Sequence, residues 1–263
     1  MPELPEVETW RRLAERKATG RVICEVQVAE DRIVMDETPP VELARLLRGR
    51  KISGTGRRGK HMWMMFDRPG HLYLHYGMSG SLTEHAPGEG PTHAKLALAL
   101  DDGMWLTYRN PRRIGKIRFY ENALTARPVA ALGPDPLIER LDPIRIEKAF
   151  TGKKRPIKNA LLDQRLFAGV GNWIADEVLY QAKISPYRHC GDLSRKDIQH
   201  LLQTLHHILV KAVEVEADDS RFPDSWLFHH RWGKQAERTG SGERIQFDTL
   251  GGRTCAWAPK RQV

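Results

Sequence analysis

The sequence lacks any apolar run near the length of about 18 residues that a membrane-spanning helix needs. We therefore expect no transmembrane helix and no contact with a membrane. The start, MPELPEVE, is acidic and contains two prolines, so it has neither the basic end nor the apolar stretch of a secretory signal peptide. The cysteine usage points to a reducing, intracellular setting.

Cysteine is scarce as well, and acidic residues are outnumbered. The three cysteines, Cys24, Cys190 and Cys255, lie far apart and form no CxxC pair, which excludes a disulfide framework and a cysteine-based zinc knuckle. Lysine and arginine number 42 against 33 aspartates and glutamates, a formal net charge of +9. This excess favours an anionic partner, because cations that neutralise phosphates release condensed counterions. Charge alone does not distinguish a nucleic-acid binder from a basic protein without a particular partner.

The first half of the chain predicts a helix followed by strands. Hydrophobic residues make up 40 % of the chain, which argues against disorder, and at roughly 150 residues per domain the length suggests one large or two ordinary domains. Val7, Trp10 and Leu13 recur at helical spacing after Pro5. Short apolar runs separated by turn residues then predict a β-sandwich or barrel. The runs are 22–28, 61–66, 72–76, 96–100, 104–108 and 116–120.

Helix signals dominate the second half. Asp142-Pro143 and Ser194 with Asp197 are typical of helix starts, and the second precedes a long apolar stripe at helical spacing. The expected fold class is α+β and multidomain. Its parts are an N-terminal helix with a β-sandwich over 1–126, a proline-rich and glycine-containing linker over 127–137, a helical domain over 138–225 and a β-hairpin over 226–263.

Pro2 and Glu3 form the first motif with chemical meaning. Removal of Met1, which a small second residue favours, exposes the secondary amine of Pro2. Such an amine attacks an aldehyde-level sugar carbon to form a Schiff base, and the positive end of the helix dipole favours its unprotonated form. Glu3 can pass a proton to the opening sugar ring. The alternative is a plain helix start with acidic residues placed to suit the dipole.

A second motif joins two predicted helices, 156–164 and 169–177, through turns that contain glycine. Gly169 and Gly171 allow a positive φ and a close backbone approach. Asn172 opens a helix whose free N–H groups suit a phosphate. Further positive charge nearby comes from Lys153, Lys154, Arg155 and Lys158.

These motifs together resemble the formamidopyrimidine-DNA glycosylase/endonuclease VIII family of base-excision repair enzymes, over nearly the whole chain and nearer the formamidopyrimidine branch. The resemblance rests on PELPEVET at 2–9, Gly59-Lys60, HYGMSGSL at 75–82, YRNPRRIG at 108–115, the two-helix segment above and GGRT at 251–254. It implies an N-terminal helix with a β-sandwich, a helix-two-turns-helix domain that binds DNA, and a C-terminal hairpin finger.

The resemblance also implies roles for single residues. Pro2 is expected to be the Schiff-base nucleophile and Glu3 the proton donor in base release. Lys60 is expected to contact phosphate and assist β-elimination, and Arg253 to bind the departing phosphate in δ-elimination. Contacts to DNA are implied for His93, Arg112, Lys153, Lys158 and Asn172. The alternatives are that an exposed lysine is only solvated and that Asn172 caps a helix.

Met78, Arg112 and Ile114 match the three side chains that, in the family, fill the gap left when a damaged nucleotide swings out. Extrusion costs a few kcal/mol of stacking, which an apolar wedge and an arginine on the orphaned base offset. Ile114 stands where an aromatic residue is usual, so we expect a relaxed preference for the opposite base. The alternative is that Met78 and Ile114 are ordinary strand residues.

The sequence departs from the family at its zinc finger. The four positions that hold zinc-binding cysteines in most relatives are occupied by Ala236, Thr239, Ala258 and Arg261, none of which suits zinc. We expect a zincless finger with no metal and no cofactor. Aromatic side chains are the candidates that hold it, namely Trp226, Phe228, Trp232, Phe247 and Trp257. A substitute metal site from His229, His230 and Cys255 is disfavoured, because adjacent histidines on a strand point to opposite faces.

The second departure is the short connection between the helix that ends near Val215 and Trp226. The formamidopyrimidine branch has a longer loop here that closes over an everted oxidised purine. We expect a monomeric DNA glycosylase with AP lyase activity by β,δ-elimination, acting on damaged double-stranded DNA in the cytoplasm or nucleoid. Alternatives are a catalytically silent protein that binds damaged DNA on the same scaffold, and a general RNA-binding protein, which predicts stacking aromatics on an exposed sheet.

Overall fold

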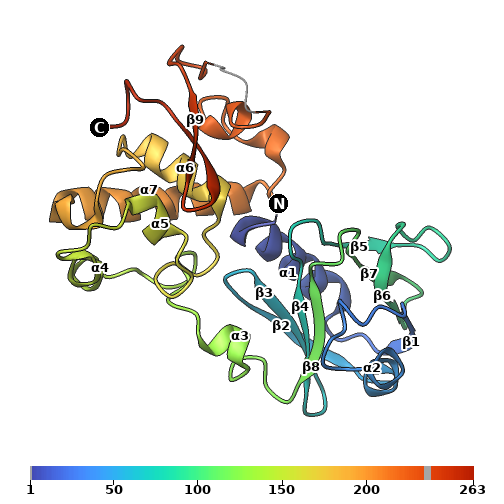
Figure 1. Ribbon diagram of the computed structural model, residues 1–263. Helices are drawn as coiled ribbons and strands as arrows, with labels where there is room; N and C mark the ends of the chain where they lie inside the picture. Colours follow the sequence, from blue (N-terminus) through green and yellow to red (C-terminus); the bar gives the residue numbers. More distant parts are fainter. Residues whose placement is uncertain (1, 234–237) are drawn as a thin grey trace. The chain divides into compact units, whose positions relative to one another are not determined.

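The computed structural model describes residues 2–233 and 238–263. The chain divides into two compact units, Met1–Ala131 and Leu132–Val263 (Figure 1). Among the described residues, no helix combines the length and the apolar character needed to cross a membrane.

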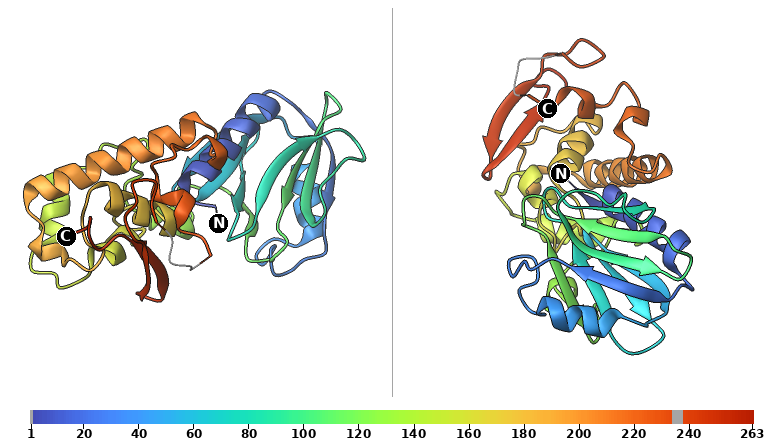
Figure 2. Two further views of the ribbon diagram at one scale, coloured as in Figure 1. Left: turned by 90° about the horizontal axis from the view of Figure 1, so that it is seen from above. Right: turned by 90° about the vertical axis from the view of Figure 1, so that its right-hand side faces the viewer.

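The first unit is a helix packed with two four-stranded antiparallel sheets. Helix α1 (Leu4–Ala18) is followed by β1 (Ile23–Val28), α2 (Pro40–Leu47), β2 (Ile52–Arg58), β3 (His61–Phe66), β4 (His71–His75), β5 (Ser81–His85), β6 (Ala94–Leu100), β7 (Trp105–Arg109), β8 (Lys116–Tyr120) and α3 (Arg127–Ala130). One sheet has the order β1-β6-β7-β5 and the other β2-β3-β4-β8. Buried side chains from both sheets and from α1 share one core, which confirms the predicted helix and β-sandwich. Figure 2 shows the ribbons of α1 and of the two sheets in two further views.

Four elements of this unit were not predicted from the sequence: β2, β5, α2 and the four-residue helix α3, which lies in the predicted linker. Strand β2 has the sequence ISGTGRR and strand β5 has SLTEH, so neither shows the apolar run that predicts a strand. Both strands are nevertheless paired, β2 with β3 and β5 with β7, because tertiary pairing overrides their weak intrinsic preference. Helix α2 is only eight residues long and begins directly after Pro39.

The second unit is mainly helical. It contains α4 (Pro143–Phe150), α5 (Ile157–Leu161), α6 (Asn172–Gln181), η1 (Cys190–Asp192), α7 (Arg195–Glu214), η2 (Asp219–Arg221), η3 (Leu227–His230), β9 (Gln246–Leu250) and β10 (Arg253–Trp257). The predicted helix starts are confirmed: Asp142 caps α4, and Ser194 and Asp197 form the capping box of α7. Every residue of the predicted stripe on α7 is buried, namely Ile198, Leu201, Leu202, Leu205, Ile208, Leu209 and Ala212.

The prediction of a hairpin over 226–263 is wrong for its first part. Residues 227–230 form the 3₁₀ helix η3, and β9 and β10 pair as a hairpin. Tyr180 of α6 and Leu227 share an apolar cluster with three side chains from the hairpin and its flanks, Ile245, Ala256 and Ala258. The hairpin is therefore packed onto α6 and does not stand alone.

The aromatic residues predicted to hold the finger fall into two groups. Trp226 and Phe228 pack with Trp173 of α6 and with Phe222. Trp232 meets the Phe228 ring edge-on and is 48 % exposed. Phe247 joins the cluster of Tyr180, and the Trp257 indole Nε1 donates to Asp248 at 2.7 Å. The first group packs the start of the segment that follows α7, and the second packs the hairpin near its end.

Candidate functional site

The site residues predicted from the sequence occur in both units. Those of the first unit are Pro2, Glu3, Lys60, Met78, His93, Arg112 and Ile114, and those of the second are Lys153, Lys158, Asn172 and Arg253. In the first unit they lie at the start of α1 and in turns between strands. In the second they lie in the loop after α4, in α5, and at the starts of α6 and β10.

Pro2 directly precedes Glu3, which is the N-cap of α1. The backbone N–H of Glu3 donates to Oε2 of Glu6 at 2.9 Å, and the Glu3 carboxylate accepts from the backbone N–H of Glu6, a reciprocal capping box. Glu3 is 1 % exposed. The plain helix start that the sequence left open is thus present, and it fixes the Glu3 carboxyl group next to Pro2.

Sequence reasoning missed Glu6 as a functional candidate. Burial and, second, the neighbouring Glu3 carboxylate raise the pKa of Glu6 to about 7. A carboxyl group that titrates near neutral pH can hold or release a proton during acid–base chemistry. The Glu-x-x-Glu spacing at 3–6 is the sequence signal that could have found it.

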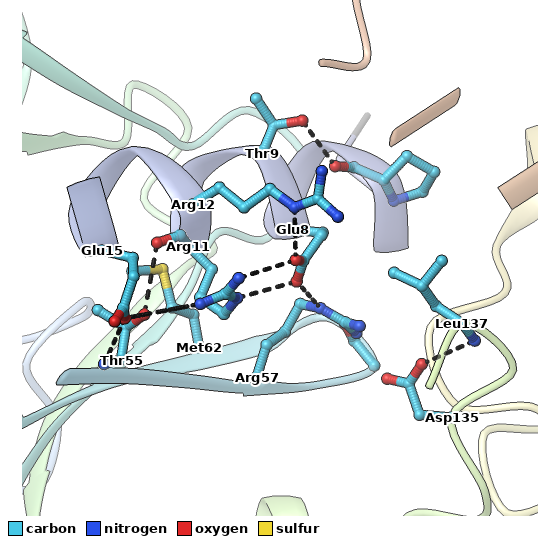
Figure 3. Close-up of polar contacts among 12 residues, drawn as sticks. Glu8, Thr9, Arg11, Arg12, Glu15, Thr55, Arg57, Met62, Asp135 and Leu137 are labelled. Atoms are coloured by element: carbon cyan, nitrogen blue, oxygen red, sulfur yellow. Dashed lines mark hydrogen bonds and ion pairs between the residues drawn. The ribbon is translucent and has the colours of Figure 1, made fainter. Parts of the chain in front are cut away.

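A buried ion pair ties α1 to the turn that carries Lys60 (Figure 3). The Glu8 carboxylate accepts from Arg57 Nε at 2.9 Å and from Arg11. Arg57 Nη1 donates to the carbonyl of Gly59 at 2.9 Å. Burial raises the pKa of Glu8, but the hydrogen bonds from Arg11 and Arg57 outweigh it and lower that pKa to about 2. Gly59 has a φ of 58°, which favours glycine at this turn. Lys60 is therefore presented from a turn fastened to the first helix.

Asn110 brings the loops of the predicted wedge together. Its Nδ2 donates to the carbonyl of Tyr76 at 2.9 Å, and its Oδ1 accepts from the backbone N–H of Ile114 at 3.2 Å. Its own backbone N–H donates to the carbonyl of His93 at 3.1 Å. The loops that carry Met78, His93, Arg112 and Ile114 therefore meet at one buried amide.

Met78 and Ile114 lie in loops and not within strands, so the ordinary-strand alternative is wrong. The Met78 side chain is 41 % exposed and the Ile114 side chain is 42 % exposed. Gly77, at a φ of 62°, lies so close to the Ile114 backbone that a Cβ there would stand 2.7 Å from the Ile114 carbonyl. Two exposed apolar side chains on touching loops suit insertion into a base stack.

Lys158 corrects a prediction. It was expected to contact DNA, but its side chain is 0 % exposed and its Nζ lies 2.6 Å from Oδ1 of Asp176. The same ammonium donates to the carbonyl of Thr254 at 2.7 Å. A lysine with no exposed surface cannot contact a phosphate of bound DNA, because its ammonium group is already paired with a carboxylate inside the protein. Lys153, in contrast, is exposed in the loop after α4.

Arg253 is exposed at the start of β10, and the strand behind it is fastened to α5 and α6. Asn172 Nδ2 donates to the carbonyl of Thr254 at 2.9 Å, beside the bond from Lys158. Asn172 is the first residue of α6 and Gly171 is the N-cap, so the interpretation of Asn172 as a cap is wrong. The turn Gly251-Gly252 has φ values of 59° and 73°. Arg253 is thus presented by a strand that is hydrogen-bonded to α5 and α6.

Glu177 of α6 predicts a pH dependence of stability. It is fully buried, and its Oε2 accepts from the backbone N–H of Phe228 at 2.8 Å. Burial raises its pKa from 4.5 to about 7. Between these values the folded state holds a proton that the unfolded chain has released, so stability falls as pH rises through this window.

Glu177→Gln is expected to flatten this dependence, because the amide cannot ionise. The difference in Tm between pH 5 and pH 7.5 should shrink by about 4 °C. Thermal unfolding across this range measures it. A slope equal to that of the parent protein would show that Glu177 does not titrate in this window.

Two family models match the chain. The formamidopyrimidine-DNA glycosylase N-terminal domain matches residues 1–117, and the formamidopyrimidine-DNA glycosylase H2TH domain matches residues 132–224. A formamidopyrimidine-DNA glycosylase of Arabidopsis thaliana is 36 % identical, over all of this chain and 71 % of its own length. One from Acidiphilium cryptum is 35 % identical over 90 % of each chain.

Solved structures agree with the sequence matches. A Lactococcus lactis enzyme variant bound to DNA that contains Fapy-dG has a TM-score of 0.87 at 28 % identity, covering 99 % of each chain. A complex of the L. lactis enzyme with abasic-site DNA has a TM-score of 0.88 at 28 % identity, covering 100 % of each. By its sequence, both of its domains and its fold, this chain belongs to the formamidopyrimidine-DNA glycosylase family.

Proposed function

We propose that this protein is a base-excision DNA glycosylase with AP lyase activity, using Pro2 as its Schiff-base nucleophile on oxidised or ring-opened bases and abasic sites. Family membership supports the activity. The observation that supports the residue is the start of α1, where Pro2 adjoins two carboxyl groups, Glu3 and Glu6, linked in a capping box. A helix start needs no free amine, whereas covalent Schiff-base catalysis does.

The proposed reaction begins when the Pro2 nitrogen bonds to C1′ of the deoxyribose and the damaged base leaves with its bonding electrons and a proton. Glu3 donates a proton to the sugar ring oxygen as the ring opens, giving an iminium ion between the Pro2 nitrogen and C1′ and leaving Glu3 as a carboxylate. Loss of a C2′ proton then expels the 3′ phosphate, with Lys60 on the phosphate. A second elimination expels the 5′ phosphate, which Arg253 binds.

Binding of the duplex is assigned to groups of both units. Lys153, Asn172 and His93 are proposed to contact the backbone, where positive charge and N–H donors suit phosphates. Arg112 is proposed to contact the orphaned base, and Met78 and Ile114 to fill the gap beside it. We propose that a single copy of the chain makes these contacts. The proposal places the protein on chromosomal DNA, at the nucleoid.

A catalytically silent protein that binds damaged DNA is the second candidate. It would bind a lesion duplex more tightly than an undamaged one, yet form no covalent product. Borohydride reduction on both duplexes separates the two: a glycosylase with a Schiff base gives a stable crosslink on lesion DNA only. Tight lesion binding without any crosslink would contradict the proposed function.

The segment between α7 and η3 predicts which lesion is handled poorly. It contains the 3₁₀ helix η2, and its Phe222 and Trp226 pack on Trp173 of α6. Because this segment is short and partly packed on α6, few of its residues can close over an everted purine. We expect 8-oxoguanine opposite cytosine to be excised at least about tenfold more slowly than a ring-opened or hydantoin lesion, a difference of about 1.4 kcal/mol in the barrier.

Single-turnover rates on one series of otherwise identical duplexes measure this preference. An abasic duplex in the same series is the control, since it needs no base recognition and reports the lyase step alone. Excision of 8-oxoguanine at a rate equal to or above that of the other lesions would overturn the prediction.

A further inference from the structure

One carboxylate, that of Glu243, gathers four side chains just before β9. Its Oε2 accepts from Thr239 Oγ1 at 2.6 Å, from Ser241 Oγ at 2.6 Å and from the Tyr180 hydroxyl at 3.0 Å. Its Oε1 lies 3.1 Å from Nη1 of Arg261. These groups come from the loop before the hairpin, from α6 and from the segment after the hairpin. We name the five residues the Glu243 cluster.

The Glu243 cluster occupies positions at which relatives are expected to hold zinc. Thr239 and Arg261 are two of the four positions, and both contact the same carboxylate. At a third, the backbone N–H of Ala258 donates to Gln262 at 2.7 Å, and the fourth, Ala236, lies outside the described residues. Where thiolates would converge on a cation, donors here converge on an anion.

Hydrogen bonds to Glu243 are strong enough to overcome its burial. Burial raises the pKa of Glu243, and the bonds from Ser241, Thr239, Arg261 and Tyr180 together lower it to about 2. The carboxylate is therefore ionised at neutral pH, and its bonds are charge-assisted. Arg261 is held a second time, since its Nε donates to the Tyr180 carbonyl at 3.1 Å and its guanidinium lies 4.5 Å from the centre of the Tyr180 ring.

The Glu243 cluster joins the two ends of the hairpin across α6. Glu243 precedes β9, Arg261 follows β10, and Tyr180 belongs to α6. A two-stranded hairpin with five residues in each strand is marginal by itself in water. Its tip is held by Lys158 and Asn172 on the Thr254 carbonyl, so the cluster supplies the second fixed point. A strand held at both ends presents its first residue, Arg253, in one position.

We propose that Glu243 is a positioning residue for Arg253, replacing with an anion-centred cluster the metal that fixes the finger elsewhere in the family. The inference rests on the proposed function, since Arg253 is assigned there to δ-elimination. The inference predicts that a substitution of Glu243 affects one step of the reaction more than the others. Loosening the base of the hairpin should weaken the step that uses Arg253 and spare the steps that use Pro2 and Lys60.

The test is the split between β- and δ-elimination products on an abasic duplex under single-turnover conditions. Glu243→Ala is expected to lower the fraction of δ product at least about threefold, while the yield of borohydride-trapped complex stays near that of the parent. Glu243→Gln, which keeps an acceptor oxygen, should give a fraction of δ product between those of the parent and of Glu243→Ala. Arg253→Ala sets the lowest δ fraction. Glu214→Ala is the matched control, a carboxylate on α7 with a side chain 59 % exposed.

Arg261→Met provides a second route if Glu243→Ala does not fold, because it removes one partner and leaves the carboxylate. It is expected to lower the δ fraction too, and the double variant should be no worse than the poorer single one. The inference would be overturned if the parent protein forms the borohydride-trapped complex in good yield and the variants give the same fraction of δ product as the parent. A uniform loss of both products would also overturn it. A parent that never traps would instead contradict the proposed function.

Discussion

Extending the protein by two residues before Pro2 is expected to abolish the borohydride-trapped complex and to slow base excision by about 10³-fold or more. The extension turns the secondary amine into an amide, whose nitrogen has no free electron pair to attack C1′. Proton transfer by Glu3 or Glu6 alone contributes on the order of 10²–10⁴ and cannot replace the covalent step. A 10³-fold loss corresponds to about 4 kcal/mol in the activation barrier.

The measurement is a single-turnover rate on a ring-opened lesion, with trapping in parallel. The matched control carries the same two residues after Val263, which adds the same mass away from α1. Binding to lesion duplex should survive the amino-terminal extension, because the proposed DNA contacts lie elsewhere. An equally strong crosslink from the extended protein would contradict a role for the Pro2 nitrogen.

The fold was predictable wherever hydrophobic periodicity was strong. The strands predicted at 61–66 and 116–120 have those bounds in the structure, and α7 buries the whole predicted stripe. Strand β2, with two glycines and two arginines, could not be found this way, because what makes it a strand is its pairing with β3. Hydrophobic periodicity reflects local preference and burial. It does not reveal a polar strand that forms because a neighbouring strand pairs with it.

The candidate site was predictable where a motif carries the chemistry in neighbouring residues. Pro2-Glu3 and Gly251-Gly252-Arg253 can be read from sequence, since adjacent residues define them. The Glu243 cluster could not be, because Tyr180, Glu243 and Arg261 meet only in the folded chain. Lys158 shows the converse error. A lysine beside other cations in the sequence predicts an exposed side chain. The Lys158 side chain instead points inward, to a carboxylate on another helix.

Lys158 holds a buried network that ties α5, α6 and β10 together. Its partner Asp176 also accepts from Arg231 Nη2 at 2.8 Å and from the backbone N–H of Ala256 at 3.2 Å. Removing one partner of a buried ion pair costs about 3–5 kcal/mol, because the remaining charge is left without its counterion. Arg231 still neutralises Asp176 in part, which places the expected cost at the lower end.

Lys158→Met is therefore expected to reduce the free energy of unfolding by about 3 kcal/mol, measured by denaturant titration. Its slope of log affinity for DNA against log salt should equal that of the parent, since no phosphate contact is lost. Lys153→Met, at an exposed position, should do the reverse: stability unchanged within about 0.5 kcal/mol, and a salt slope smaller by about 1. If Lys158→Met lowered the salt slope and left stability intact, the ammonium would be free to reach DNA, and the network would not be what holds the strand behind Arg253.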